Sequence, residues 1–284
     1  MSTLSAEDVQ KLMSNPSTET RSETAQKVAV SFTDGALGDV ERKLASEIFR
    51  VLAKDAEERV RHALSQNLKN ASGVPQDVAK TLATDISDKV ALPIIQHSDA
   101  LSEDDLIEIV RGNAPQRQVA VASRDDVSEN VAEVLVDEAD KTAVVALVSN
   151  DRVDLSEKVL DKVVENYGDD LDVQDPLVKR PTLPITITEK LVTKLTDDLK
   201  DYLVKHHDLS EATATDLILQ ARERATIGLA STYNDETDVE ALIRQLHSGN
   251  RLTPSIIFRA LCVGDISFFE MALSVLANVP LQNA

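Results

Sequence analysis

Few side chains in this sequence could do chemistry, and the densest group is the run His206-His207-Asp208. A metal site there needs further ligands, because adjacent residues of a helix point about 100° apart and cannot together surround an ion. Histidines are common at the C-terminal end of a helix, where a positive charge is stabilised. We therefore expect a helix end here rather than a metal site. The other histidines are isolated and are expected at the surface or at helix ends: His62, His97 and His247.

Cys262 is the single cysteine of the chain. A nucleophilic thiol needs a pKa lowered by a nearby cation or a helix N-terminus, whereas residues 260–263 (ALCV) form an apolar segment near an expected helix end. We interpret Cys262 as a buried structural thiol. One cysteine cannot form an intrachain disulfide, which favours a reducing compartment.

The 49 acidic residues form several clusters. Residues 169–175 hold four aspartates but lack the central glycine and closing glutamate of an EF-hand calcium loop. Glu103, Asp104 and Asp105 are typical of the first turn of a helix, where acids interact with the helix dipole. The phosphate-binding motifs GxGxxG and GxxxxGK[ST] and the catalytic motifs GxSxG and HExxH do not occur in the sequence. We therefore assign no catalytic, cofactor-binding or metal-binding residue and expect no cofactor.

These residues lie on segments in which apolar side chains recur every three or four positions, as in amphipathic helices. Residues 44–52, 101–110 and 191–203 are examples. Alternation with a period of two is rare, and its best candidate, residues 183–188, contains Pro184 and makes a poor strand. We predict an all-α protein.

A helix-start signature recurs along the chain: an aliphatic residue, then Ser, Thr or Pro, then Glu or Gln. It begins at Val74, Leu101, Val127, Leu155, Ile187 and Leu209. The hydroxyl can accept a hydrogen bond from the free N–H groups of the first turn, and the acid favours that helix end. Shorter apolar segments lie between these starts, at 60–64, 90–95, 119–122 and 144–148. The repeating unit is therefore a pair of short antiparallel helices of about 26 to 30 residues.

One such pair cannot bury its own apolar faces, so pairs must stack on their neighbours. We predict an α-solenoid of stacked antiparallel helix pairs, HEAT-like in type, over residues 53–208, with an N-terminal helical cap at 1–52 and a C-terminal helical subdomain at 209–284. Small residues such as Ala91 and Ala120 allow close approach of helices and account for an aromatic content of 3%. An irregular helical bundle is the alternative.

Two further segments depart from the repeat. Residues 167–186 are rich in Asp and Pro and are expected to form an extended connection. Near the C-terminus, Thr253-Pro254 is a helix cap followed by a first-turn proline. Gly264 is expected to end that helix, and Asp265 to cap the next one.

Residues 252–273 (LTPSIIFRALCVGDISFFEMAL), followed by Val279-Pro280, resemble an alphaproteobacterial family catalogued as a domain of unknown function. Residues 101–107 (LSEDDLI) share this resemblance, and residues 55–64 (DAEERVRHAL) are similar to the start of a HEAT-like repeat. The resemblance extends from about residue 4 to residue 281. It implies an all-helical, HEAT-like fold and implies no activity, cofactor or catalytic residue.

The chain has 30 basic and 49 acidic residues, a net charge of −19. This charge argues against binding to nucleic acid or to an anionic membrane surface. No apolar run reaches the roughly 20 residues of a membrane-spanning helix, and the N-terminus lacks the features of a secretory signal. We expect a cytoplasmic protein that does not insert into a membrane. A HEAT-like base-excision enzyme is an alternative that needs five basic residues to converge on one face: Lys179, Arg180, Arg222, Arg224 and Arg244.

Residues 252–284 contain three charged residues. We predict an interaction surface in this segment, since Phe and Met are enriched at interfaces; it consists of Ile256, Ile257, Phe258, Phe268, Phe269 and Leu276. The same residues could instead form the core of a cap that closes the solenoid.

These observations favour a non-enzymatic scaffold or adaptor with a regulatory role that binds a basic protein or peptide. Two alternatives remain open. One is an enzyme, or an enzyme subunit, that acts on a small ligand through a site shared with a second chain. The other is a structural homo-oligomer that associates through the C-terminal helices.

Overall fold

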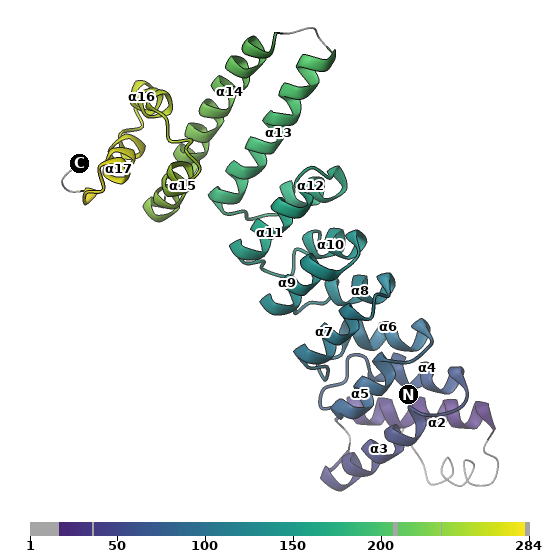
Figure 1. Cartoon of the computed structure of the whole chain (residues 1–284). Coiled ribbons are helices and arrows are strands. Elements are labelled where there is room, and N and C mark those ends of the chain that lie inside the picture. The colour runs from purple at the N-terminus through teal and green to yellow at the C-terminus, as the bar shows by residue number, and fades with distance from the viewer. Residues whose placement is uncertain (1–16, 36, 207–209, 234, 282–284) are drawn as a thin grey trace. The chain divides into compact units, whose positions relative to one another are not determined.

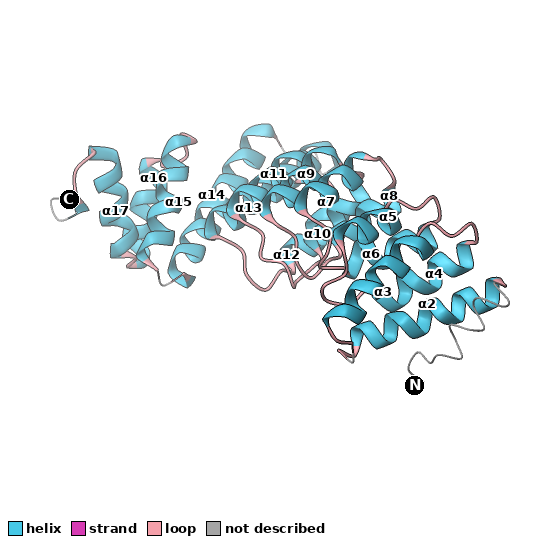
Figure 2. Ribbon diagram, turned by 90° about the horizontal axis from the view of Figure 1, so that it is seen from below, coloured by secondary structure: helices cyan, strands magenta, loops and turns pink. Residues whose placement is uncertain are grey.

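The computed structural model describes residues 17–35, 37–206, 210–233 and 235–281. Within these ranges every regular element is a helix and no strand occurs (Figure 2), so the predicted all-α class is confirmed. None of the sixteen helices described is long and apolar enough to cross a lipid bilayer. The chain divides into two compact units between Leu155 and Ser156. The finer segments 1–52, 53–208 and 209–284 stay a prediction from the repeat pattern.

The described part of the first unit is made of helix pairs arranged in two rows (Figure 1). In one row α2, α4, α6, α8 and α10 each pack on the next, and in the other α3 packs on α5 and α7 on α9. The bounds are α2 (Thr18–Thr33), α3 (Asp39–Leu52), α4 (Glu58–Leu68), α5 (Gln76–Ala83), α6 (Asp88–His97), α7 (Glu103–Arg111), α8 (Pro115–Ala122), α9 (Glu129–Glu138) and α10 (Lys141–Val148).

The local sequence determines where these helices begin. The Ser102 hydroxyl accepts a hydrogen bond from the Asp105 backbone N–H at 3.3 Å, and the Asp105 carboxylate accepts one from the Ser102 N–H at 3.1 Å. This reciprocal capping box opens α7. The Ser128 hydroxyl caps α9 by accepting a hydrogen bond from the Val131 N–H. The predicted starts of α5, α7 and α9 are therefore confirmed.

Ion pairs join several helices of the first unit to their equivalents in the next pair. Arg50 binds Asp77 at 2.6 Å, Lys80 binds Glu108 at 2.8 Å, and Arg111 binds Glu138 at 2.9 Å. These repeat-linking pairs connect residues 27, 28 and 27 positions apart and tie α3, α5, α7 and α9 together. Arg117 and Asp88, 29 positions apart, link α8 to α6 at 2.8 Å.

Buried polar side chains donate hydrogen bonds to backbone carbonyls at helix ends of the first unit. The Arg124 guanidinium, 2% exposed, donates to the carbonyls of Ile95 at 2.7 Å and Ser98 at 3.0 Å. Asn150 donates to the carbonyls of Ala122 at 3.0 Å and Arg124 at 2.7 Å. Both residues supply donors to carbonyls at or just after helix C-termini, where the helix itself provides none.

The second unit begins with short helices and continues with a long hairpin and three further helices (Figure 1). α11 packs on α13, α13 packs on α14 and α15, α14 packs on α16, and α17 packs on both α15 and α16. The bounds are α11 (Glu157–Tyr167), α12 (Leu171–Val178), α13 (Ile185–His206), α14 (Glu211–Thr232), α15 (Glu236–Ser248), α16 (Pro254–Val263) and α17 (Ile266–Ala277).

The extended connection expected over residues 167–186 is wrong, because this segment contains α12. Asp170 caps the helix by accepting a hydrogen bond from the Asp172 N–H at 3.0 Å. Val173 and Leu177 are buried, and Pro176 lies inside the helix. The aspartates that suggested a loop thus include the cap and a first-turn acid of a short helix.

One expected helix start is also wrong. α13 begins at Ile185, so Thr188 lies within its first turn and donates to the Pro184 carbonyl at 3.1 Å. Pro184 directly before the helix sets the earlier start, since it has no N–H that needs a partner. In contrast, the starts of α11 at Glu157 and α14 at Glu211 are confirmed.

The predicted starts of the last two helices, and the predicted end of α16, are confirmed. Thr253 caps α16, which begins at Pro254, and Asp265 caps α17 by accepting from the Phe268 N–H at 3.0 Å. Gly264 ends α16 with a φ of +87°, a left-handed conformation that glycine adopts without strain.

Candidate interaction surfaces

The six residues predicted as a C-terminal interaction surface divide between core and surface. Three are buried in the core of the second unit: Ile256, Ile257 and Phe268. Phe269 is partly buried against that core, whereas Phe258 is 66% exposed and Leu276 is 47% exposed. The two faces of α16 differ because Ile256, Ile257 and Ala260 point inward together, which turns Phe258 outward.

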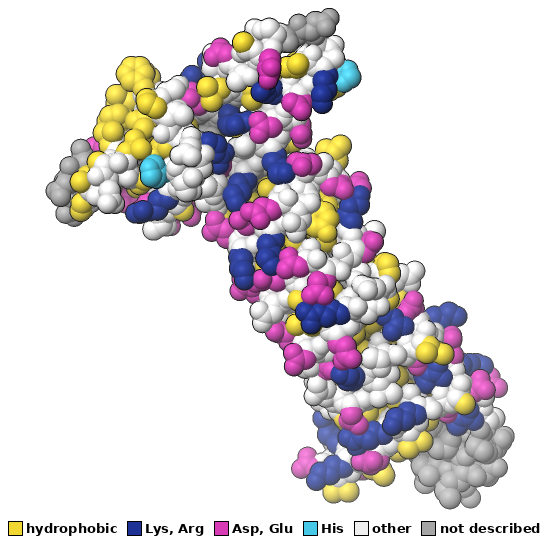
Figure 3. Space-filling view, in the orientation of Figure 1, with side chains coloured by type: hydrophobic (Ala, Val, Ile, Leu, Met, Phe, Trp, Pro, Cys, Tyr) yellow, Lys and Arg dark blue, Asp and Glu magenta, His cyan; other side chains and the backbone are white. Residues whose placement is uncertain are grey.

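Further apolar side chains extend the exposed face of α16. We call Phe258, Leu261 and Val263 of α16, together with Ile266 at the start of α17, the α16 surface; they are 66%, 39%, 64% and 48% exposed. Figure 3 shows apolar side chains gathered over α16. A contiguous exposed apolar area of this kind is typical of interaction sites.

This part of the second unit has few charged side chains, and two of the three are engaged in contacts within the protein. Of the three charged residues in 252–284, Arg259 binds the buried Glu223 at 3.0 Å, and Asp265 is used as the cap of α17. Glu270 is the third, and it is exposed on α17. The α16 surface therefore offers little charge to water or to a partner.

Cys262 is exposed, so the predicted buried thiol is wrong. It lies two positions after the buried Ala260, which places it on the opposite side of α16. The segment 260–263 is apolar on more than one helix face, and composition alone could not tell the buried side from the exposed one.

Two buried carboxylates anchor the C-terminal helices; the helix-start signature included Glu189 only as a first-turn acid, and no sequence pattern predicted that either glutamate is buried. Glu189 on α13 has no exposed surface and accepts hydrogen bonds from both Arg251 Nη atoms, at 2.6 and 3.0 Å, and from Gln245 Nε2 at 3.0 Å. Glu223 on α14 is 4% exposed and accepts from Arg259 Nε and Ser255 Oγ, both at 3.0 Å.

A cavity of about 170 Å³ lies between these carboxylates and is also lined by Arg222, Asn250 and Arg251. Its charged groups are already engaged, since Arg222 binds Asp197 at 2.5 Å and each glutamate binds an arginine. Buried charges paired in this way are typical of a structural junction. We therefore assign these residues to the positioning of α16 rather than to chemistry.

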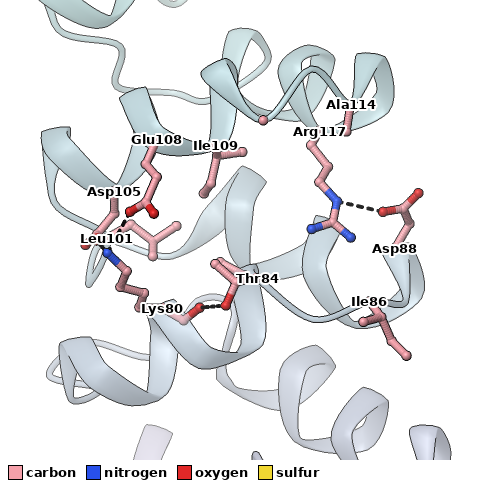
Figure 4. A pocket seen from close by; sticks show the side chains of 12 residues that line it. Lys80, Thr84, Ile86, Asp88, Leu101, Asp105, Glu108, Ile109, Ala114 and Arg117 are labelled. Atoms are coloured by element: carbon pink, nitrogen blue, oxygen red, sulfur yellow. Dashed lines mark hydrogen bonds and ion pairs between the residues drawn. The ribbon is translucent and has the colours of Figure 1, made fainter.

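A larger groove, of about 520 Å³, opens in the first unit between the pairs α5–α6 and α7–α8 (Figure 4). Its apolar lining comes from Ala83, Ile86, Leu101, Ile109 and Ala114. Charged side chains stand at its two ends: Lys80 with Asp105 and Glu108 on one side, and Arg117 with Asp88 on the other. We call this cavity the α5–α8 groove.

The charges at one end of the groove are fixed by mutual contacts. Lys80 Nζ lies 2.8 Å from a carboxylate oxygen of Asp105 and 2.8 Å from one of Glu108. Both contacts raise the pKa of Lys80, and the contact with Asp105 has the larger effect. Burial acts to raise the pKa of Asp105, but hydrogen bonds from Lys80, Gln76 and Ser102 outweigh it and hold that pKa well below its ordinary value. Both groups are therefore charged at neutral pH.

Of the four histidines described, His62 lies within α4 and the other three lie at or near helix ends. His206 ends α13 and contacts the Tyr202 ring at a centroid distance of 4.5 Å, while His207 and Asp208 lie outside the described residues. The remaining three are His62, which contacts the Lys89 carbonyl at 2.8 Å, and His97 and His247, both exposed near helix ends. Over residues 17–35, 37–206, 210–233 and 235–281, no three His, Cys, Asp or Glu side chains come together as metal ligands.

Three of the five basic residues considered for a nucleic-acid face form ion pairs with acidic neighbours. Lys179 binds Asp175 at 2.6 Å, and Arg244 binds Glu240 at 2.6 Å. With Arg222 on Asp197, three of these cations are neutralised locally. Such pairing lowers the positive potential that a phosphate backbone requires.

Neither the curated proteins nor the solved structures contain a match to this chain. A profile of the family described as "Uncharacterised protein conserved in bacteria (DUF2336)" matches residues 90–284, which is more than half of the sequence. The matched range includes α7 to α17 and thus the whole α16 surface. The chain belongs to the bacterial DUF2336 family.

Proposed function

We propose that this protein is a non-enzymatic, regulatory scaffold or adaptor of the cytoplasm that binds a basic protein partner. The observation that carries the proposal is the α16 surface, an exposed apolar area in a chain with a net charge of −19. Exposed apolar area costs free energy in water, roughly 25 cal/mol per Å², and a partner that covers it recovers this free energy. We expect Phe258 to be an anchor, because it is the most exposed residue of this surface and aromatic side chains are enriched at interfaces.

The scaffold proposed is an α-solenoid of HEAT-like helix pairs. Two features support it: the two rows of successive helices in the first unit, and the repeat-linking pairs, which with the Arg117–Asp88 pair have spacings of 27 to 29 residues. Each pair then contacts mainly its neighbours, as in repeat proteins with long binding surfaces.

A basic partner fits the electrostatics. The excess of 49 acidic over 30 basic residues speeds the encounter with a positively charged protein and repels acidic ones. The apolar α16 surface then supplies the contact area that charge alone does not. Association is expected to slow as the salt concentration rises, because salt screens exposed charges.

A site-specific crosslink tests this proposal. The photoreactive residue p-benzoylphenylalanine replaces Phe258 in the host bacterium and, as a control, replaces Val178, an exposed apolar residue of α12. We expect a crosslink to a basic protein from position 258 and not from position 178, and its loss when Val263→Glu is added. No crosslink at 258, or the same products from both positions, would contradict the proposal.

A homo-oligomer is the second candidate, favoured by the charge distribution on the C-terminal helices. Two chains of −19 repel each other least where each surface lacks exposed charge, and the α16 surface is such a place. In this case position 258 crosslinks to a second copy of the chain. Sedimentation equilibrium would then give a dimer for the wild type and a monomer for Phe258→Glu.

A further inference from the structure

We infer that the α5–α8 groove binds a short peptide segment of a partner protein in which aliphatic side chains alternate with arginine or lysine. The inference rests on the proposed scaffold function and assigns a second contact site, in the first unit. The groove has a volume of about 520 Å³, which lies within the usual range for ligand pockets, about 300–1,000 Å³.

An exposed aliphatic side chain, Ile86, lies at the rim of the groove. It belongs to the loop between α5 and α6 (Figure 4), and it is 94% exposed. The lining of the groove also includes Ala83, Ile109 and Ala114. An aliphatic side chain inserted here would contact both this lining and Ile86 and would remove apolar surface on both molecules from water.

The charges at the rim favour a basic neighbour for that aliphatic side chain. The exposed carboxylates are Glu108, with 68% of its side chain exposed, and Asp88, with 45%, whereas Arg117 is only 19% exposed. Glu108 binds Lys80 through Oε2, and Asp88 binds Arg117 through Oδ1. The other oxygen of each carboxylate can therefore accept a hydrogen bond from a guanidinium or ammonium group of the peptide.

An anionic ligand fits this groove less well. Lys80 is shared between Asp105 and Glu108, and Arg117 is held by Asp88 and by the Asp85 carbonyl at 2.6 Å. An anion would have to displace one of these partners and leave a carboxylate unpaired. A basic peptide adds to the existing ion pairs without breaking them, so the groove is organised in advance for it.

Binding of a designed peptide tests the inference. The probe is the fluorescein-labelled peptide GRLRLRG, and its binding to the full chain is followed by fluorescence anisotropy. A peptide with Glu in place of each Arg serves as the acidic control. The chain offers close control variants: Glu47 on α3 matches Glu108, since the side chains are 69% and 68% exposed and each binds one cation of its own unit. Val40, 81% exposed on α3, matches Ile86.

We expect Ile86→Ser and Glu108→Gln each to weaken binding of GRLRLRG at least about fivefold, as losses of a buried apolar contact and of a charge-assisted hydrogen bond. Val40→Ser and Glu47→Gln should stay within about twofold of the wild type, as surface changes away from the site. Thermal unfolding of each variant confirms that it is folded. Glu47→Gln and Glu108→Gln change the net charge equally. Any loss of non-specific attraction between the basic peptide and the acidic chain is therefore the same in both variants.

An equal loss in test and control variants, equal binding of the acidic peptide, or no binding of GRLRLRG would overturn the inference. These outcomes leave the scaffold proposal standing if position 258 still crosslinks to a basic protein. Conversely, a peptide that binds at Ile86 and Glu108 while position 258 gives no crosslink would reject the α16 surface and retain the groove.

Discussion

Arg251 holds both carboxylate oxygens of Glu189, at 2.6 and 3.0 Å, across 62 residues of sequence. Glu189 has no exposed surface, while the Arg251 side chain is 28% exposed. The pair ties α13 to the segment that precedes α16, so it helps to fix the helix that bears the α16 surface. Ion pairs of this kind add little net stability over an apolar replacement, but loss of one partner is costly.

The first prediction concerns this pair. Arg251→Ala leaves a buried carboxylate without its cation and is expected to lower the free energy of unfolding by about 3–5 kcal/mol in urea titrations followed by circular dichroism. Adding Glu189→Met should restore part of that loss. The comparison is Arg244→Ala, which removes an exposed pair with Glu240 and should cost no more than about 0.5 kcal/mol. Equal losses for the two alanine variants would contradict the assignment.

The second prediction concerns pH. The pKa of Asp105 is lowered in the folded chain, so its stabilisation is fully present above its ordinary pKa of 3.8 and is lost as the pH falls toward the lower folded value. Asp105→Asn should therefore cost about 1–3 kcal/mol at pH 7 and should lose less further stability on acidification than the wild type does.

Asp104→Asn is the control for this change, because Asp104 is exposed in the same first turn of α7. Its stability at pH 7 should stay within about 0.5 kcal/mol of the wild type. Urea titrations of the three proteins at pH 7 and pH 3 give the comparison. If Asp105→Asn and the wild type lose the same free energy between these pH values, the lowered pKa is not a source of stability.

The third prediction separates core from surface on the C-terminal helices. Phe268 has no exposed surface, and Phe268→Ala should lower the free energy of unfolding by about 3–5 kcal/mol. Phe258→Ala removes a ring that is 66% exposed and should change it by less than about 1 kcal/mol. A test of partner binding or association should therefore use position 258, since changes at 268 act on folding. Similar losses at both positions would show that Phe258 is covered.

The fourth prediction concerns Cys262. Because its thiol is exposed on α16, an aromatic disulfide reagent that releases a coloured thiolate should label one thiol per native chain without denaturant. Cys262→Ser should abolish the reaction and leave the thermal midpoint nearly unchanged. Labelling that begins only as the protein unfolds would restore the interpretation of a buried thiol. If a partner covers the α16 surface, its addition should slow the reaction.

Helix starts were the most predictable part of the fold, because their cause is local. Ser102, Ser128, Ser156 and Ser210 each accept a hydrogen bond from the N–H of the third residue that follows, and the chemistry of that contact is visible in four residues of sequence. Thr188 has the same signature but lies inside α13. The local pattern indicates that Thr188 could cap a helix, but Pro184, which lies earlier in the sequence, determines where α13 begins.

Burial of charge was not predictable in the same way. Glu189 and Glu223 sit in ordinary helical sequence, and their partners Arg251 and Arg259 lie 62 and 36 positions away. The apolar face of α16 posed a similar problem, since α16 carries apolar side chains on several sides and period alone could not assign Ile256 inward and Phe258 outward. In both cases the tertiary packing of the second unit decides, and it is not encoded within one turn of helix.

The repeat-linking pairs also affect how the protein can change in evolution. Lys80 binds a carboxylate in the following helix pair, and Arg50 and Arg111 do the same at nearly the same spacing, 27 or 28 residues. A gene duplication of that length would copy one cation and one carboxylate together and place each opposite a ready partner. The first unit could therefore gain or lose whole helix pairs without a new set of matching charges, and its reach could be adjusted in steps.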